Sequence, residues 1–175
     1  MNSDTEVKPS VTPFFHAPTG TWTYVVADPA SRAAAVIDPV LDYDWRSGRT
    51  GTKSADTLVA HCAKERLEVA SILETHAHAD HLSAAPYLQS RLGGRIAIGR
   101  GILQVQATFK RIFGLGADFA ADGSQFDALL ADGDRIDLGA IPGQVIAAPG
   151  HTSDSVAYLV GDALFVGDTV FMPDG

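Results

Sequence analysis

A run of seven residues, 75–81, has the sequence THAHADH and follows directly after an apolar stretch that we predict to be a buried strand. Side chains alternate along an extended segment, so His76 and His78 should point the same way. A turn then brings Asp80 and His81 round to the same pocket. Buried polar groups need partners, and a divalent cation would be a partner for three imidazoles and a carboxylate. Because these groups need a partner and follow a predicted strand, we expect a metal site at a strand end. The spacing of the histidines differs from that of the helical zincin motif.

Two later segments carry further candidate ligands. His151 lies in PGHT, after a predicted strand and a Pro-Gly pair that lets the backbone turn sharply. Asp168 lies in GDT at the end of an apolar strand, where it needs a cation or hydrogen-bond donors. Taken alone, His151 would be interpreted as a solvated loop histidine and Asp168 as a turn residue. Together with the histidine run they indicate three loops that converge at the C-terminal ends of strands.

THAHADH, PGHT and GDT, in this order and at this spacing, resemble the metallo-β-lactamase fold superfamily, in its branch of glyoxalase II and persulfide dioxygenases. Residues 12–51 and 102–116 look more like bacterial persulfide dioxygenases than like glyoxalase II. The resemblance covers residues 11–175 and implies an α/β (α+β) αββα sandwich with its site at one edge. We expect residues 1–10 to be a flexible tail. Family members continue past this point, so the expected sandwich is C-terminally incomplete.

The dioxygenase branch implies a specific ligand set and activity. One iron(II) per chain would be held by His76, His151 and Asp168, a facial arrangement that leaves three coordination positions open for dioxygen and a persulfide sulfur. The implied reaction oxidises glutathione persulfide-like substrates with O2 to sulfite and a thiol, a step of sulfide detoxification. The other polar residues of the histidine run, His78, Asp80 and His81, would orient the ligands and water.

Two other readings stay open. A glyoxalase II-like thioester hydrolase would use one or two zinc ions. The resemblance implies that the first is held by His76, His78, His151 and a bridging Asp168, and the second by Asp80, His81 and Asp168 with a further downstream histidine. No histidine follows His151. Ligand types alone do not choose the metal, because zinc generally outcompetes iron(II) at such sites. A truncated, catalytically silent metal-binding module is the third reading. The chain is then a fragment, or it completes its sheet by strand exchange in a homodimer.

Basic residues are the expected contacts of glutathione, because it carries carboxylates. The long segment 39–53, in which we predict no regular element, holds three of them, and a predicted helix with an apolar stripe holds two more. Tyr87 lies on the helix after the histidine run and is a further candidate for the pocket wall. The predicted substrate contacts are Arg46, Arg49, Lys53, Lys110, Arg111 and Tyr87.

Composition limits the partners and the compartment. Thirteen Lys and Arg against 21 Asp and Glu give a net charge of -8, which argues against non-specific nucleic-acid binding. The most apolar stretch contains Asp162 and Asp168, so we expect no membrane span. The single cysteine, Cys62, cannot form an intrachain disulfide, and the start of the chain shows no secretory signal. We predict a cytoplasmic protein.

The periodicity of apolar residues predicts alternating strands and helices. Cys62 falls on the apolar face of a helix that begins after Ser54 as N-cap, so we expect a packed thiol. The second helix ends at Gly93-Gly94. The predicted strands are 11–16, 21–27, 33–38, 69–74, 95–99, 144–148, 155–160 and 163–166, and the predicted helices are 54–67, 83–92 and one that carries Ile102, Val105, Phe109, Ile112 and Phe113.

Overall fold

The computed structural model describes residues 8–171. None of the helices in this part of the chain is long and apolar enough to cross a membrane. The elements, in chain order, are β1 (Ser10–His16), β2 (Thr21–Ala27), β3 (Ala33–Ile37), β4 (Val40–Asp44), β5 (Arg49–Gly51), α1 (Lys53–Glu65), β6 (Glu68–Glu74), β7 (Leu82–Ser83), α2 (Ala85–Leu92), β8 (Arg95–Gly99), α3 (Ile102–Ile112), β9 (Ala128–Leu130), β10 (Gly143–Ala147), β11 (Val156–Val160), β12 (Ala163–Phe165) and the 3-10 turn η1 (Gly167–Thr169).

The main sheet has the strand order β1-β2-β3-β6-β8-β9. Its first three strands are antiparallel, as the short turns between them predict, whereas β3, β6, β8 and β9 are parallel. A second sheet contains β10, β11 and β12, all antiparallel. Parallel strands end at the same edge of a sheet, so the segments that follow β3, β6 and β8 lie together there.

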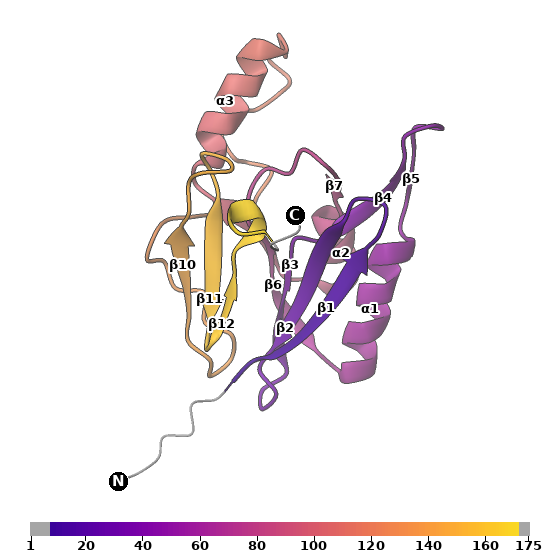
Figure 1. Cartoon of the computed structure of the whole chain (residues 1–175), viewed down its shortest axis with the longest axis vertical. Helices are drawn as coiled ribbons and strands as arrows, with labels where there is room; N and C mark the ends of the chain where they lie inside the picture. Colours follow the sequence, from indigo (N-terminus) through magenta and orange to yellow (C-terminus); the bar gives the residue numbers. More distant parts are fainter. Residues whose placement is uncertain (1–7, 172–175) are drawn as a thin grey trace.

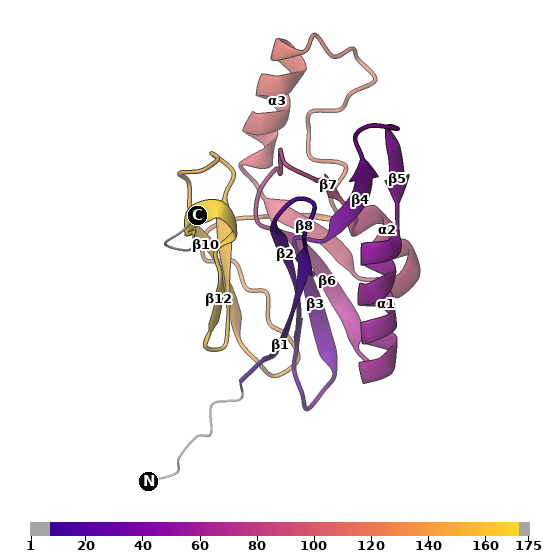
Figure 2. The same cartoon turned by 45° about the vertical axis from the view of Figure 1, so that its right-hand side comes forward.

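Two apolar cores separate three layers. Helices α1 and α2 cover one face of the main sheet, and the small sheet packs against its other face (Figures 1 and 2). Cys62 is 1% exposed in the helix-side core, and burial raises the pKa of its thiol to about 11, so the expected packed thiol is confirmed. The predicted mixed α/β sandwich is confirmed as well. Within residues 8–171 it comprises an α layer and two β layers.

Several boundaries differ from the prediction for identifiable reasons. The segment 39–53, for which we predicted no regular element, contains the hairpin β4–β5. Its many polar and turn residues give no strand pattern in the sequence. Helix α1 begins at Lys53 with Thr52 at the N-cap, not with Ser54. Ser54 instead donates its N–H and its hydroxyl to Asp42 of β4, at 2.8 and 2.6 Å. The predicted tail 1–10 mostly lies outside the described residues, and β1 already begins at Ser10.

Helix α3 projects from the body of the molecule (Figure 1). Its amphipathic pattern predicts the helix but not its surroundings. Ile102 is buried at the base, whereas Phe109, Ile112 and Phe113 are 46%, 61% and 67% exposed. The rings of Phe109 and Phe113 stack 5.5 Å apart along the helix. The apolar stripe therefore borders an open cleft and does not pack into either core.

Asp28 joins the β2–β3 turn to the segment before β10. Its carboxylate accepts hydrogen bonds from the backbone N–H of Ala140 and Ala30 and from the hydroxyl of Ser31. These bonds, that of Ala140 foremost, lower the pKa of Asp28 from 3.8 to about 2. The stabilisation is therefore complete above pH 4 and is lost as the pH falls through 2.

We expect Asp28→Asn to lower the melting temperature at neutral pH, because an amide NH2 in place of either oxygen would face at least one backbone N–H donor. The variant should also lose part of the decline in stability between pH 4 and 2. Thermal unfolding followed by circular dichroism at several pH values measures both effects. Glu65→Gln, at the exposed end of α1, is the control. Parallel pH profiles for wild type and Asp28→Asn would contradict the assignment.

Candidate metal centre

His76 follows β6 and is 1% exposed. Its Nδ1 lies 2.9 Å from the hydroxyl oxygen of Thr75, and that hydroxyl donates to Asp38 at 2.8 Å. Because the hydroxyl proton is used in this way, the Thr75 oxygen accepts Nδ1–H, which fixes the tautomer and leaves a lone pair on Nε2. Among the described residues, His76 Nε2 is buried without a hydrogen-bond partner. A buried unpartnered nitrogen of this kind fits a metal ligand.

His151 and Asp168 lie beside this nitrogen. An oxygen of Asp168 is 4.0 Å from His76 Nε2 and 3.5 Å from His151 Nε2, and the three ligand atoms lie within 4.8 Å of one another. Ligands placed about 2.1 Å from one metal ion are separated by roughly 3 to 4 Å, so the group fits around a single ion. Burial lowers the pKa of His76, which favours the neutral imidazole that a metal requires.

A second group lies next to the first. His78, Asp80 and His81 also place ligand atoms within 4.8 Å of one another. His81 Nδ1 is 3.1 Å from the carbonyl of Leu82, and in the described structure His81 Nε2 is buried without a partner. Asp80 accepts a hydrogen bond from the hydroxyl of Thr21 at 3.1 Å. The structure thus brings all six predicted ligands and orienting residues to one edge of the main sheet.

His78 is held by two carboxylates that our prediction did not include. Its Nε2 lies 3.1 Å from both Asp38 and Glu74. Burial lowers the pKa of His78, but the hydrogen bonds to these carboxylates outweigh burial and raise it to about 10. Asp38 and Glu74 end or follow the apolar strands β3 and β6. The reasoning that selected Asp168, an acid at the end of an apolar strand, could have found both.

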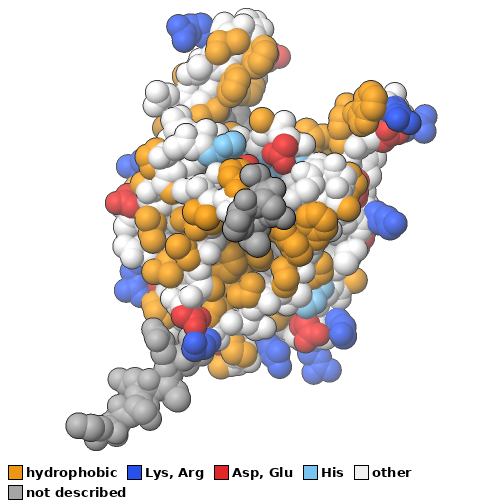
Figure 3. All heavy atoms as spheres, in the orientation of Figure 1, with side chains coloured by type: hydrophobic (Ala, Val, Ile, Leu, Met, Phe, Trp, Pro, Cys, Tyr) orange, Lys and Arg blue, Asp and Glu red, His pale blue; other side chains and the backbone are white. Residues whose placement is uncertain are grey.

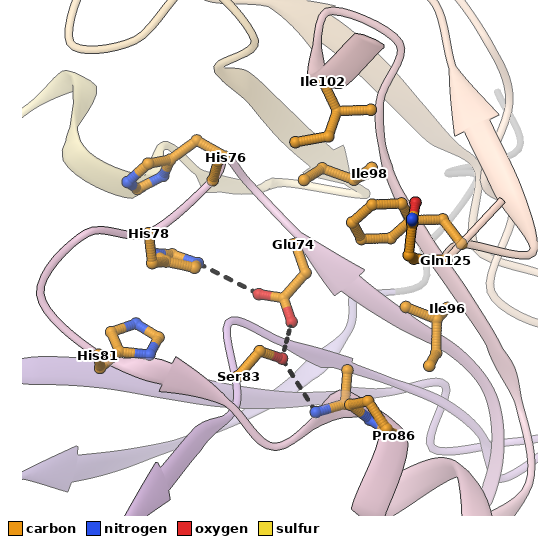
Figure 4. A pocket seen from close by; sticks show the side chains of 13 residues that line it. Glu74, His76, His78, His81, Ser83, Pro86, Ile96, Ile98, Ile102 and Gln125 are labelled. Atoms are coloured by element: carbon orange, nitrogen blue, oxygen red, sulfur yellow. Dashed lines mark hydrogen bonds and ion pairs between the residues drawn. The ribbon is translucent and has the colours of Figure 1, made fainter. Parts of the chain in front are cut away.

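Glu74 is embedded in its own network. Ser83 donates to one carboxylate oxygen, and His78 contacts the other (Figure 4). Tyr158 of β11 donates its hydroxyl to the backbone carbonyl of Glu74 at 2.7 Å, which ties the small sheet to the end of β6. Burial raises the pKa of the Glu74 carboxyl. These contacts leave the Glu74 carboxylate directed at His78, not at His76.

An open cleft of about 730 Å³ lies beneath α3 and reaches the histidine run at His78. Phe109 and Phe113 of α3 line one side, and the loop that contains Asp154 lines the other. Ala77 and His78 line it as well. Asp154 also accepts a hydrogen bond from the backbone N–H of Ala77 at 2.9 Å, so the loop after β10 is fixed to the histidine run.

The predicted substrate contacts surround the centre at a distance. Helix α3 and the β4–β5 hairpin project on either side of a face where histidine is visible (Figures 1 and 3). Arg46 and Arg49 lie on the hairpin, and Lys53 is the first residue of α1. The guanidinium of Arg46 lies 5.3 Å from the ring centre of Trp45. The last turn of α3 carries Lys110 and Arg111.

None of these five basic residues lines the cleft beneath α3. Lys110 donates to the backbone carbonyl of Phe119. Tyr87 donates its hydroxyl to Asp56 of α1, on the helical side of the main sheet. The structure therefore places Tyr87 in a contact between helices. Four of the basic residues lie on the two projections, and Lys53 lies at the start of α1.

Comparison with known proteins identifies the family. The model of the metallo-β-lactamase superfamily matches residues 16–175. The chain belongs to the metallo-β-lactamase superfamily. A probable metallo-hydrolase of Burkholderia pseudomallei is 51% identical over 92% of this chain and 58% of its own length. The mitochondrial persulfide dioxygenase ETHE1 of Bos taurus is 30% identical over 87% of this chain and 49% of its own length.

Solved structures agree with this membership. The crystal structure of ETHE1 from Myxococcus xanthus superimposes with a TM-score of 0.70 at 29% identity, covering 93% of this chain and 59% of that one. This metallo-β-lactamase superfamily chain thus spans about half the length of the relatives it matches. The predicted family and fold are confirmed.

Gly167 holds Asp168 in place by close packing. It has a φ of +51°, and a Cβ added there would lie 2.9 Å from the Cβ of Thr75 and overlap its hydroxyl. We expect Gly167→Ala to push η1 away from β6 and to weaken metal binding by roughly 10-fold or more. Competition with a chromophoric chelator measures the affinity. The matched control is Gly150→Ala, where an added Cβ meets nothing within 4 Å. Equal affinities in the two variants would contradict this role.

Proposed function

We propose that this chain contains the catalytic metal site of a non-haem iron(II)-dependent persulfide dioxygenase that acts on glutathione persulfide-like substrates. The overall reaction is RSSH + O2 + H2O → RSH + H2SO3, in which the outer sulfur is oxidised and O2 is reduced. The observation that carries this proposal is the convergence of His76, His151 and Asp168 around one ion position. The likeness to persulfide dioxygenases supports it.

Iron(II) held by His76, His151 and Asp168 would offer coordination positions to a persulfide sulfur and dioxygen. The residues of the chain supply the surroundings. Asp38 and Thr75 fix the orientation of His76 through the hydroxyl of Thr75. The carboxylates of Asp38 and Glu74 raise the pKa of His78 to about 10, which favours its protonated form. Since Nε2–H is used by Asp38 and Glu74, Nδ1–H is the donor that His78 retains for an anionic substrate.

The basic residues on the two projections have a role in this proposal. Persulfides and the carboxylates of glutathione are anionic, and the chain carries a net charge of -8. Positive charge on both sides of the metal-binding face raises the local concentration of an anionic substrate. We assign this steering role to Arg46, Arg49, Lys53, Lys110 and Arg111, none of which needs to touch the metal.

A second candidate function rests on the neighbouring group. His78, Asp80 and His81 could bind a second ion, and the unpartnered His81 Nε2 favours this. The site would then fit a zinc-dependent, glyoxalase II-like thioester hydrolase, in which zinc lowers the pKa of the attacking water. The name of the Burkholderia relative, a probable metallo-hydrolase, agrees with this alternative.

Metal loading followed by two assays separates the candidates. Protein loaded anaerobically with iron(II) should bind one iron per chain, consume O2 with glutathione persulfide and release one sulfite per O2. Asp168→Asn should abolish this activity. Two zinc ions per chain, with hydrolysis of lactoylglutathione and no oxygen uptake, would establish the hydrolase instead. If a metal-stabilised protein showed neither activity, the catalytically silent metal-binding module would be the remaining interpretation. Light scattering on the same sample tests the proposed homodimer.

A further inference from the structure

A second cavity, of about 270 Å³, reaches the metal-binding residues from the side of β8. Figure 4 shows His76 and His78 on one side of it and isoleucines on the other, with Glu74 between them. This cavity and the cleft beneath α3 share Ala77, His78 and Ile102, and otherwise different elements line them. The cavity thus reaches His76, one of the three proposed ligands, whereas the cleft reaches His78 beside it.

The wall of this cavity opposite the histidines is apolar. Ile96 and Ile98 are two residues apart on β8 and therefore face the same side of the strand. They are 6% and 2% exposed, and Ile102 from the first turn of α3 is 5% exposed. Phe126 completes this wall. No lysine or arginine lines the cavity, so its isoleucine side carries no positive charge for an anionic persulfide.

The polar groups of the wall are already hydrogen-bonded. Ser83 donates to Glu74, and the other oxygen of Glu74 contacts His78. The side-chain carbonyl of Gln125 accepts from Gln106 at 2.9 Å, while its amide donates to a backbone carbonyl at 2.7 Å. A bound water needs two to four polar partners, whereas apolar cavities attract small apolar molecules such as xenon. Away from the histidines, this cavity is built for an apolar occupant.

We infer that the cavity holds dioxygen for the reaction at the metal centre, while the anionic persulfide enters from the cleft beneath α3. This inference rests on the proposed dioxygenase function. Dioxygen is small, neutral and apolar, and so matches the isoleucine wall. The persulfide matches the larger cleft beneath α3, a helix whose last turn carries Lys110 and Arg111. Separate approaches allow both substrates to reach one metal ion without competing for the same space.

Xenon binding tests the cavity without any turnover. Crystals of the metal-loaded chain, pressurised with xenon, should show a xenon atom between Ile98 and Phe126. The atom should be absent in Ile98→Phe, whose larger side chain fills the space, and present in Ile146→Phe, an exposed substitution on β10. No xenon in the unsubstituted protein would overturn the inference, even if Ile98→Phe failed to fold.

Steady-state kinetics tests the role of the occupant. Ile98→Phe should lower kcat/KM for O2 by roughly fivefold or more, with KM for glutathione persulfide within about twofold of the wild-type value. Ile146→Phe should change neither. A rise in the persulfide KM instead would show that the cavity holds the persulfide, which overturns the inference. Absent oxygen uptake in wild type, with xenon bound, would be a failure of the proposed function itself.

Discussion

His76→Ala protein will contain almost no metal after purification and dialysis, whereas wild type will hold about one equivalent per chain. We expect the affinity to fall by more than roughly 100-fold, the upper end of the cost of losing an outer-sphere partner of a ligand. His76 should be the most sensitive ligand because it is 1% exposed, and the ion would face an apolar gap in its place. The side chains of His151 and Asp168 are 42% and 39% exposed, so water can partly replace them.

Inductively coupled plasma mass spectrometry after loading with iron(II) or zinc measures the metal content. His61→Ala is the matched control, because His61 lies on α1, on the helical side of the main sheet, where its ring contacts that of Phe14. A His76→Ala protein with a full equivalent of metal would show that the ion is bound elsewhere.

Asp38→Ala should have the second-largest effect, and it should damage both stability and metal binding. Asp38 accepts the N–H and the hydroxyl of Thr75 at 2.7 and 2.8 Å and lies 3.1 Å from His78. Removing it leaves the buried imidazole of His78 with one carboxylate fewer. Breaking a buried ion pair in this way typically lowers the free energy of unfolding by about 3–5 kcal/mol. Alanine would also have to adopt the positive φ of 50° at this position. We expect a further 10- to 100-fold loss of metal affinity.

Urea unfolding of the metal-free protein isolates the stability term, and chelator competition isolates the binding term. Asp38→Asn is the informative companion, because asparagine tolerates the left-handed backbone and keeps one acceptor oxygen. It should lose less stability than Asp38→Ala and still bind metal more weakly than wild type. A stable Asp38→Ala protein with unchanged affinity would refute the proposed role of Asp38.

Much of the metal centre was predictable from the sequence because ligands at strand ends are local features. The alternation of His76 and His78 and the turn to Asp80 and His81 follow from strand geometry. The loops of His151 and Asp168 follow from the adjacent apolar runs. Glu74 was missed because it was counted as the last residue of a strand, not as a partner of His78 four residues later. An acid that is the last residue of an apolar strand needs a cation or hydrogen-bond donors, as does an acid that follows such a strand.

The fold was less predictable where contacts are distant in sequence. The hairpin β4–β5 is held by its pairing with β7 and by the bonds of Asp42 to α1, which no local pattern reveals. The apolar stripe of α3 predicts a helix with an apolar face. It does not tell whether that face packs into a core or borders a cleft, because both need the same residue spacing.

The three proposed ligands belong to different layers of the fold. His76 follows a strand of the main sheet, whereas His151 and Asp168 follow strands of the small sheet. A bound ion would therefore join the two sheets across the long stretch of chain between residues 76 and 151, and would add to the apolar core in offsetting the entropic cost of that closure. Metal occupancy would then control how firmly the small sheet docks. Hydrogen exchange in β10–β12 should accelerate on metal removal well before that of β6 and β8, so that the ion acts on folding as well as on chemistry.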